Sequence, residues 1–433
     1  MGAGLLYNPR IMKAILGITA GVLVAAGAVC GENWANWRGP AGNGSTAKSP
    51  APTEFSEKSG ILWKAELPGR GCSTPVTWGE RIFVTTPIGK EDGVMAFDWK
   101  GEELWRKTLG ALTPGRGQRV GSSANSSPIT DGKHVFAYFK SGNVAGFTVE
   151  GTLLWKVNLH EKYGEDKLWW DQGTSPVLAG GNIVIAVMQT EGNSYLVSLD
   201  PKTGDEVWFT KRDIETTAES GDSYATPHVV EINGVETIVS FGADHLTGHD
   251  AKSGKELWRS AGFNPDMEKM WRVIASSVVT NDVVVVPFKR GDALGALKLD
   301  GIPAKSDKDW LWRKDGIGTD AVSPVALNGK LIIVKDSGKT RGLVTCLDAL
   351  TGKVVWEANL PKSAKIYYSS PILAGNKFYI AREDGVVITA TVSDKGLKDV
   401  KENDLGEGVI ASLVMVNDKL LIRGEQHLFC IGK

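Results

Sequence analysis

Short apolar runs separated by tight polar turns fill most of this chain. The unit that begins at Ser175 is representative, and its apolar runs cover residues 177–178, 183–187, 195–199 and 206–209. Runs of this length, rich in Val, Ile, Leu and aromatic residues, are typical of buried β-strands, and the Gly-, Asn- and Asp-containing turns between them are typical of hairpins. The pattern therefore predicts four-stranded antiparallel units, and no long helical periodicity competes with it.

A Ser/Thr-Pro step, or a looser copy of it, opens each unit and recurs about every 50 residues along the chain. The hydroxyl residues of the eight steps are Thr74, Ser127, Ser175, Thr226, Ser276, Ser323, Ser370 and Ser412. Within the strands of the unit that begins at Ser175, proline stands only at the start of the first strand, at Pro176, where the missing N–H does least harm. A period of this size predicts an array of small supersecondary units.

A second repeated pattern places an Asp and a Gly before a Trp, as in Asp200 to Trp208, Asp250 to Trp258 and Asp348 to Trp356. The Asp can cap a turn and the Gly can adopt a positive φ. We predict that each Trp lies on the outermost strand of its unit and packs onto the neighbouring one. The seventh unit departs from the pattern, because its outer strand carries Leu397 and Val400 and no Trp.

The two ends of the repeat region complement each other. The last unit, residues 412–433, contains only three apolar runs, and residues 61–67 form an isolated run that contains Trp63. Pairing that run with the last unit would close a ring and remove the open sheet edges. The sequence therefore predicts an all-β, eight-bladed propeller over residues 61–433, closed by an N-terminal strand that completes the last blade.

The first residues have the pattern of an export signal. Arg10 and Lys13 precede an apolar stretch, residues 15–29, which contains a cleavage-like step at residues 26–28. We predict a signal peptide over residues 1–28 and a periplasmic or secreted protein. Cys30 could carry a lipid anchor, but Val29 before it disfavours this reading, because lipoprotein signals normally place a small residue there. No later apolar run approaches the length of a membrane-spanning helix.

Residues 29–60 form a polar segment rich in Gly, Pro and Ser. We expect this segment to wrap around the outside of the ring, with Trp34 and Trp37 docking it there. The whole chain has a formal net charge of −1 at pH 7, which argues against nucleic acid or an anionic membrane as partner. The four cysteines are far apart in sequence and do not suggest a disulfide framework. We expect a monomer.

The Asp-x-x-Thr-Gly-x-x-x-Trp step, best matched at residues 199–208, 249–258 and 347–356, resembles the repeat of the pyrroloquinoline-quinone (PQQ) family of eight-bladed propellers. The leader at residues 34–40 is similar to the opening of secreted PQQ-like propeller proteins. The resemblance covers about residues 61–433. It implies one of two functions: a quinone-dependent alcohol or sugar dehydrogenase, or a non-enzymatic protein such as the outer-membrane assembly lipoprotein BamB.

The residues favour the non-enzymatic branch. The dehydrogenases of this family commonly carry two adjacent cysteines over the quinone, and this chain has no such pair. They also hold a Ca²⁺ with carboxylate and amide oxygens, and no matching motif is recognisable here. We therefore expect no cofactor, no catalytic residue and no metal site. Under the alternative of a PQQ dehydrogenase with Ca²⁺, Arg119, Asp171 and Arg272 would be the first contacts to examine.

The residues just before each Ser/Thr-Pro step are expected at one mouth of the central channel, and charged or aromatic side chains recur there. The predicted ligand-binding set is Arg70, Arg119, Trp170, Asp171, Asp222, Trp271, Arg272, Asp320, Tyr368 and Glu407. Aromatic plates and Arg side chains suit a peptide, a sugar or a planar anion.

Two interpretations of this set stay open. The charges could instead pair with one another and stiffen a solvated rim, as surface charges usually do. The preferred function is an exported binding scaffold for an envelope protein or a small polar ligand. A carbohydrate-binding propeller that stacks sugars on Trp170, Trp271 and Tyr368 is a further alternative.

Overall fold

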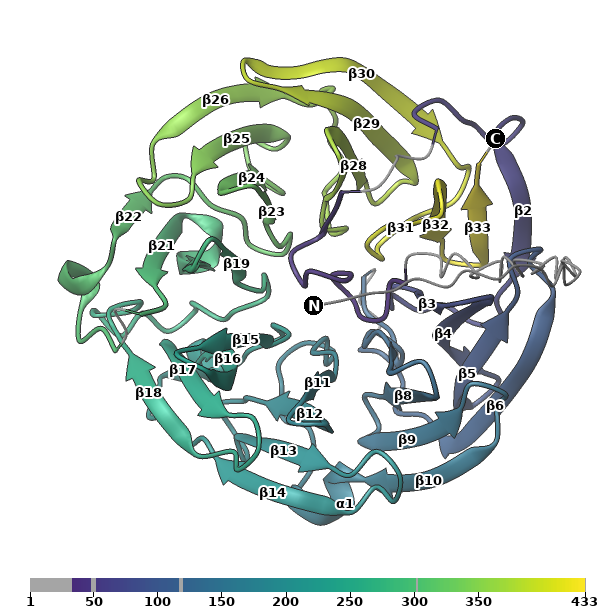
Figure 1. Cartoon of the computed structure of the whole chain (residues 1–433), viewed down its shortest axis with the longest axis horizontal. Coiled ribbons are helices and arrows are strands. Elements are labelled where there is room, and N and C mark those ends of the chain that lie inside the picture. The colour runs from purple at the N-terminus through teal and green to yellow at the C-terminus, as the bar shows by residue number, and fades with distance from the viewer. Residues whose placement is uncertain (1–32, 48–51, 117–119, 301–302, 433) are drawn as a thin grey trace, which may run out of the picture. The chain divides into compact units, whose positions relative to one another are not determined.

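The computed structural model describes residues 33–47, 52–116, 120–300 and 303–432, all within one compact unit, Gly31–Lys433. Its strands form eight separate sheets, antiparallel except for one pair, arranged around a central axis with the first strand of each blade toward the centre (Figure 1). The predicted eight-bladed propeller is confirmed. The signal peptide predicted at 1–28 and Cys30 lie outside the described residues, and the domain boundaries stay predictions.

The first four blades each contain four strands in chain order. Their bounds are β3 (Val76–Trp78), β4 (Arg81–Ile88), β5 (Glu91–Phe97) and β6 (Glu103–Ala111); β7 (Ile129–Thr130), β8 (His134–Tyr138), β9 (Asn143–Thr148) and β10 (Leu153–Asn158); β11 (Val177–Ala179), β12 (Asn182–Val187), β13 (Tyr195–Leu199) and β14 (Glu206–Lys211); β15 (His228–Ile232), β16 (Val235–Gly242), β17 (His245–Asp250) and β18 (Glu256–Ser260).

The last four blades follow the same plan with two additions from the N-terminal region. Their bounds are β19 (Val278–Thr280), β20 (Val283–Phe288), β21 (Ala293–Lys298) and β22 (Trp312–Asp315); β23 (Val325–Leu327), β24 (Lys330–Val334), β25 (Leu343–Asp348) and β26 (Val354–Asn359); β1 (Ser45–Thr46), β27 (Ile372–Ala374), β28 (Lys377–Ala381), β29 (Val386–Ser393) and β30 (Gly396–Asp404); β31 (Val414–Val416), β32 (Lys419–Arg423), β33 (His427–Ile431) and β2 (Ile61–Glu66).

The ring closes as predicted. Strand β2 pairs antiparallel with β33, from Ile61 opposite Ile431 to Glu66 opposite His427. The eighth blade therefore contains both ends of the repeat region, and its apolar residues share one core cluster with residues of blades one and seven. Closure by pairing leaves no open end in the array of blades.

The tryptophans of the outer strands join neighbouring blades, which confirms their predicted role. Trp208 on β14 is 7% exposed, and its Nε1–H donates to the carbonyl of Ala251 in the next blade at 3.2 Å. Trp63, Trp105, Trp155 and Trp312 donate to turn carbonyls in the same way. The glycine of each such turn is required by contact: a Cβ on Gly254, whose φ is +70°, would lie 2.3 Å from the Trp208 ring.

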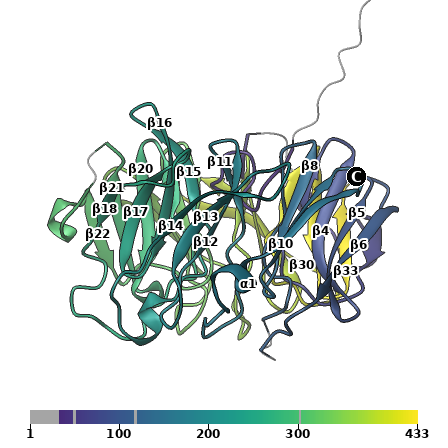
Figure 2. The same cartoon turned by 90° about the horizontal axis from the view of Figure 1, so that it is seen from below.

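In the part of the chain that the structure describes, short helical turns occur only in loops. They are α1 (Leu159–Tyr163) and the 3₁₀ turns η1 (Ala218–Gly221), η2 (Lys289–Gly291) and η3 (Asp307–Asp309). Asn158 begins α1, because its side chain accepts hydrogen bonds from the amides of His160 and Glu161. The side view places α1 at one face of the ring and the hairpin turn between β15 and β16 at the opposite face (Figure 2).

The N-terminal polar segment corrects one expectation. Its residues 33–47 do not wrap around the outside, because they enter the centre of the ring: Trp34 is fully buried, and β1 adds in parallel to β27, an innermost strand. Arg38 anchors the segment by donating to the carbonyls of Pro324 at 2.8 Å and Pro371 at 3.0 Å. Burial lowers the pKa of its guanidinium to about 9.

The segment enters the centre of the ring because the innermost strands present backbone N–H groups that have no partner inside their own blade. The carbonyls of the segment accept hydrogen bonds from several of these groups. The later part of the segment does lie against an outer strand. The amide of Phe55 donates to Asn403 Oδ1 on β30 at 2.7 Å, and the amide of Glu57 donates to the carbonyl of Asp404.

Candidate channel-mouth site

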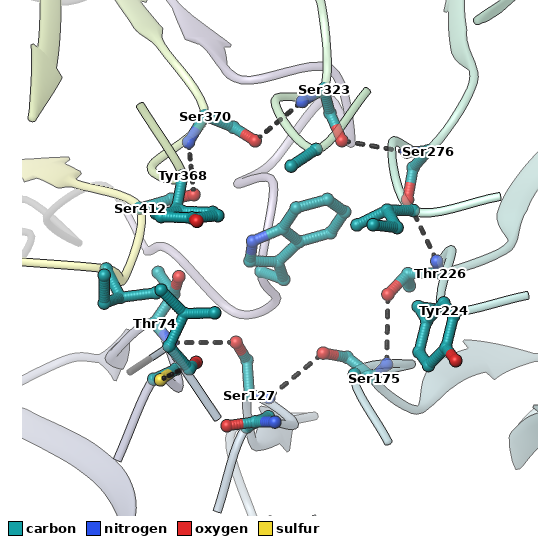
Figure 3. Close-up of a pocket in the computed structure, with 18 of the residues that line it drawn as sticks. Thr74, Ser127, Ser175, Tyr224, Thr226, Ser276, Ser323, Tyr368, Ser370 and Ser412 are labelled. Atoms are coloured by element: carbon teal, nitrogen blue, oxygen red, sulfur yellow. Dashed lines mark hydrogen bonds between the residues drawn. The ribbon is translucent and has the colours of Figure 1, made fainter. Parts of the chain in front are cut away.

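A chain of hydrogen bonds between hydroxyl residues surrounds the central channel. The backbone N–H of each step residue donates to the side-chain oxygen of the next, from Thr74 to Ser127 and onward to Ser412, in seven bonds of 2.9–3.0 Å (Figure 3). The repeated Ser/Thr step therefore has a structural role, because each hydroxyl ties its blade to the preceding one. The predicted repeat is thus also the inner ring of the propeller.

Blades eight and one are joined differently. Arg423 on β32 is 1% exposed, and its Nη1 donates to the carbonyl of Thr85 at 2.5 Å and to Ser73 Oγ. The pKa of this guanidinium falls to about 10 because of burial. Gly71 beside it leaves the space that the side chain fills, since a Cβ there would lie 2.0 Å from Arg423 Nη2.

The hydroxyl ring encloses a cavity of about 320 Å³. Tyr224 and Tyr368 lie at opposite sides of its wall (Figure 3), and Trp37 from the N-terminal segment also lines it. Among the described lining residues, Asp171 and Arg272 are the two charged ones. The cavity wall is therefore made mainly of hydroxyl groups, aromatic rings and short apolar side chains.

Arg272 is fully engaged by carboxylates. Its Nη1 and Nη2 donate to the two carboxylate oxygens of Asp320, at 3.0 Å each, and its Nε lies 3.2 Å from Glu219 Oε1. Glu219, with a side chain 2% exposed, also accepts from Trp170 Nε1 at 2.8 Å and lies 3.4 Å from Arg290 Nη1. One buried glutamate thus holds three neighbouring loops together.

Asp171 is engaged in a similar way. It forms an ion pair with Lys140, and both side chains are 5% exposed or less. The carboxylate also accepts from the backbone N–H of Arg116 at 3.1 Å. Removing either member of such a buried pair would leave an uncompensated charge, so the pair stabilises the loop conformation.

The structure brings four of the predicted ligand-binding residues together at the cavity: Trp170, Asp171, Arg272 and Tyr368. The other described candidates lie apart from its wall and have partners of their own. Three of them are carboxylates: Asp222 accepts from the amides of Trp169 and Thr190, Asp320 accepts from Arg272, and Glu407 lies 2.5 Å from His427 Nδ1. Arg70 forms an ion pair with Glu425 at 3.3 Å, and the ring of Trp271 contacts the ammonium group of Lys289. Arg119 lies outside the described residues.

These contacts support the interpretation in which the rim charges pair with one another. A ligand that depended on free charges would have to break buried ion pairs, whereas the hydroxyl and aromatic groups of the cavity wall stay available for neutral polar or aromatic contacts. Ligand binding by the predicted set stays a prediction.

Two loops, which hydrogen bonds of Glu219 and Arg290 link to each other, carry exposed apolar side chains next to the cavity. We call these side chains the apolar patch, and its members are Trp169, Trp170, Met267 and Met270, which are 44%, 40%, 47% and 43% exposed. The backbone beneath it is well held: the carbonyl of Met267 accepts from Thr217 Oγ1 at 3.1 Å, and that of Met270 accepts from Arg290 Nη1 at 3.3 Å. The patch is therefore apolar surface on a fixed backbone.

The cavity does not match the needs of PQQ with Ca²⁺. PQQ carries carboxylates, and the cation in the described wall, Arg272, is already paired with Asp320 and Glu219. Asp171, the carboxylate there, is paired with Lys140. In the described part of the chain no group of three or more His, Cys, Asp or Glu residues is placed to hold a metal ion. We derive no catalytic step through this cofactor.

Comparison with known proteins gives the family. The family model described as outer membrane protein assembly factor BamB matches residues 53–215, 148–307 and 304–399, which together span most of the propeller. The chain belongs to this BamB family of PQQ-like propellers.

Individual relatives agree with membership of the BamB family. The outer membrane protein assembly factor BamB of Burkholderia pseudomallei is 25% identical over 377 residues, which cover 78% of this chain and 90% of the relative.

Two solved structures share the fold. BamB from Moraxella catarrhalis aligns with a TM-score of 0.59 at 13% identity, covering 86% of this chain and 97% of that one. A europium-containing methanol dehydrogenase aligns with a TM-score of 0.67 at 12% identity, covering 92% and 89%. At such identities the likeness shows the fold alone, so it does not separate the two branches of function.

No helix in the described residues has the length and apolar character needed to cross a membrane. Sequence reasoning missed two residues that organise this BamB-family site. Glu219 lies in a loop with no repeat counterpart, and Trp37 was expected on the outside of the ring. Trp37 carries no local signal of its position, because the contacts that hold its segment are long-range.

Proposed function

We propose that this chain is an exported, non-catalytic propeller that holds a partner protein in the cell envelope, as part of outer-membrane protein assembly. Family membership supports the general role, because the matching family model and the Burkholderia relative are both described as outer membrane protein assembly factors. The paired charges of the cavity weigh against a quinone enzyme.

The apolar patch is the observation that carries the proposal. Two Trp and two Met side chains, each at least 40% exposed, lie on two loops that are linked through Glu219 and Arg290. Exposed aromatic and Met residues are enriched at protein interfaces, and Met adapts to differently shaped partners. The buried Glu219, which is paired with Arg272 and Arg290, links the loops that carry the patch.

Other exposed apolar residues differ from the patch in their arrangement. Leu104, Val207 and Leu257 lie on the outer strands of three different blades, next to the packed Trp of each. Apolar residues that are exposed singly are normal on protein surfaces, whereas gathered ones mark interaction sites. The outer-strand residues therefore serve as controls.

The test is affinity capture from detergent-solubilised envelopes of the host. The double variant Trp169→Ser/Met267→Ser is compared with Val207→Ser/Leu257→Ser, which removes a similar exposed apolar surface from the outer strands. We expect the patch variant to lose its envelope partner and to lower the amount of assembled outer-membrane proteins in cells. The control variant should retain both.

If the two variants captured the same amount of the envelope partner, the patch would not be the surface that binds it. The enzymatic alternative is tested separately, by titrating the purified protein with PQQ and Ca²⁺ while following absorbance and melting temperature. A stoichiometric spectral change with a higher melting temperature would overturn the non-catalytic role.

A further inference from the structure

The innermost strands of the blades present the same backbone groups to the centre of the ring. In each blade the second residue after the prolyl position of the step lies in a non-hydrogen-bonded pair with the next strand, as Thr77 does with Ile82 and Leu178 with Ile183. In such a pair the N–H and C=O point away from the neighbouring strand. Each blade therefore directs one amide toward the channel.

The N-terminal segment binds these amides at four blades. The amide of Thr77 in blade one donates to the carbonyl of Trp34 at 2.9 Å, and that of Thr130 in blade two donates to the carbonyl of Ala35 at 3.0 Å. On the far side of the ring, Ala326 in blade six and Leu373 in blade seven donate to the carbonyls of Asn43 and Gly44, at 3.3 and 3.0 Å. Carbonyls of neighbouring residues in the segment thus accept from the amides of neighbouring blades.

Blades three, four and five lack this contact. Their equivalent residues are Leu178, Val229 and Val279, whose ladder partners Ile183, Ile238 and Val284 place their amides in the same orientation. No hydrogen bond joins these three amides to the described part of the N-terminal segment. The equivalent residue of blade eight, Met415, has a partner.

The segment misses these blades because it crosses the ring instead of following it. Between Ala35 and Asn43 it leaves blade two and reaches blade six, and a cavity of about 280 Å³ lies between it and the innermost strands of blades three to five. Leu178, Val229 and Val279 all line this cavity. It shares Trp37 and Thr226 with the channel-mouth cavity, so these two residues lie between the two spaces.

We propose that this second cavity is a groove for an extended peptide of another polypeptide, which adds to the innermost strands β11, β15 and β19 by backbone hydrogen bonding. Those carbonyls of the peptide that face the strands would accept from Leu178, Val229 and Val279, as the carbonyls of the N-terminal segment do at the neighbouring blades. Strand addition of this kind draws affinity from the main chain and selectivity from side-chain pockets.

The wall of the groove sets the class of peptide. Its side chains are mainly apolar and include Ile129, Val177 and Val230, together with Pro176 and Pro227. Arg38, the charged side chain in the described wall, already donates to three backbone carbonyls. The groove therefore fits short β-branched or small apolar side chains better than charged ones.

The test uses the acetylated and amidated peptide Thr-Val-Ser-Val-Thr as the probe and follows amide hydrogen exchange by mass spectrometry. We expect saturating peptide to slow exchange in β11, β15 and β19 about tenfold or more, because their channel-facing amides become hydrogen bonded. Strands β3 and β27 provide the internal reference, since their channel-facing amides are already bonded and should not change.

A matched pair of variants tests the location. Ala41 is exposed and lines the groove, so Ala41→Phe should fill it and weaken peptide binding about tenfold or more, as measured by fluorescence anisotropy of a labelled peptide. Ala111 is exposed at the end of outer strand β6, so Ala111→Phe should leave binding unchanged.

Three results would overturn the proposal. One is equal binding by the two variants, and another is protection confined to the hydroxyl ring around Ser175 and Thr226 or spread over the whole chain. The third is that β11, β15 and β19 exchange as slowly as β3 and β27 before any peptide is added, which would mean that the groove is already filled. None of these readouts depends on the apolar patch, so the groove and the proposed function can fail independently.

Discussion

Replacing Trp208 by Ala tests how the blades are held together. The indole is 7% exposed, lies against Gly254 of the next blade and donates to the carbonyl of Ala251 at 3.2 Å. Truncating a buried Trp to Ala typically lowers the free energy of unfolding by about 3–5 kcal/mol, because transfer and cavity effects add. The lost hydrogen bond leaves a turn carbonyl without its donor and contributes about 1 kcal/mol of that loss.

The assay is urea unfolding followed by far-ultraviolet circular dichroism, with Val207→Ala as the matched control on the same strand. Val207 is 48% exposed, so its truncation should change the unfolding free energy by about 0.5 kcal/mol or less. A loss below about 1 kcal/mol for Trp208→Ala would refute the reasoning, since it would mean that the tryptophans are not the main contacts between blades.

Three further predictions concern buried polar groups. Burial lowers the pKa of His249 to about 4, so between pH 6.5 and pH 4 the unfolded chain binds a proton that the folded chain does not bind. On acidification through this range, the free energy of unfolding of the parent protein should therefore fall by up to about 3 kcal/mol more than that of His249→Gln, as measured by unfolding at each pH. Burial raises the pKa of Asp92 to about 6, so the folded chain holds a proton that the unfolded chain releases between pH 4 and pH 6. As the pH rises over this range, the free energy of unfolding of the parent should therefore fall by up to about 3 kcal/mol, whereas that of Asp92→Asn should not. Parallel pH profiles of the two proteins would contradict this. Arg423→Ala should destabilise the closure of blade eight on blade one by about 2–4 kcal/mol in urea unfolding, and a change within experimental error would show that the pairing of β2 with β33 suffices.

Most of the fold could be predicted from the sequence, because the signals are local and repeated. The Ser/Thr-Pro step or a looser copy of it marks each innermost strand, and turns like the one before Trp208 mark several of the outermost strands. Closure by residues 61–66 followed from counting strands, since a three-stranded last blade requires a fourth from elsewhere.

The path of the N-terminal segment could not be read in the same way. Its composition is polar and its sequence does not repeat, so nothing local distinguishes an outer wrap from an inner crossing. The deciding interactions are long-range: Arg38 bonds to carbonyls of Pro324 and Pro371, which lie in blades six and seven.

The candidate site could be predicted in part. Four residues chosen because they precede a step, Trp170, Asp171, Arg272 and Tyr368, line the cavity, and ligand binding by them stays a prediction. The pairing of the charges was not predictable, because it depends on loop conformations. Glu219, which binds both Trp170 and Arg272, lies in a loop between blades three and four and comes into place only when that loop folds over its neighbours.

The most direct test of a protein-docking role is photo-crosslinking in intact cells, with a benzoylphenylalanine at position 267 and, as control, at position 207. Met267 lies in the apolar patch and Val207 on an outer strand, and both are nearly half exposed. The proposed function predicts an adduct with one envelope protein from position 267 and none from position 207. Equal adducts from both positions, or none from either, would contradict a partner docked on the patch.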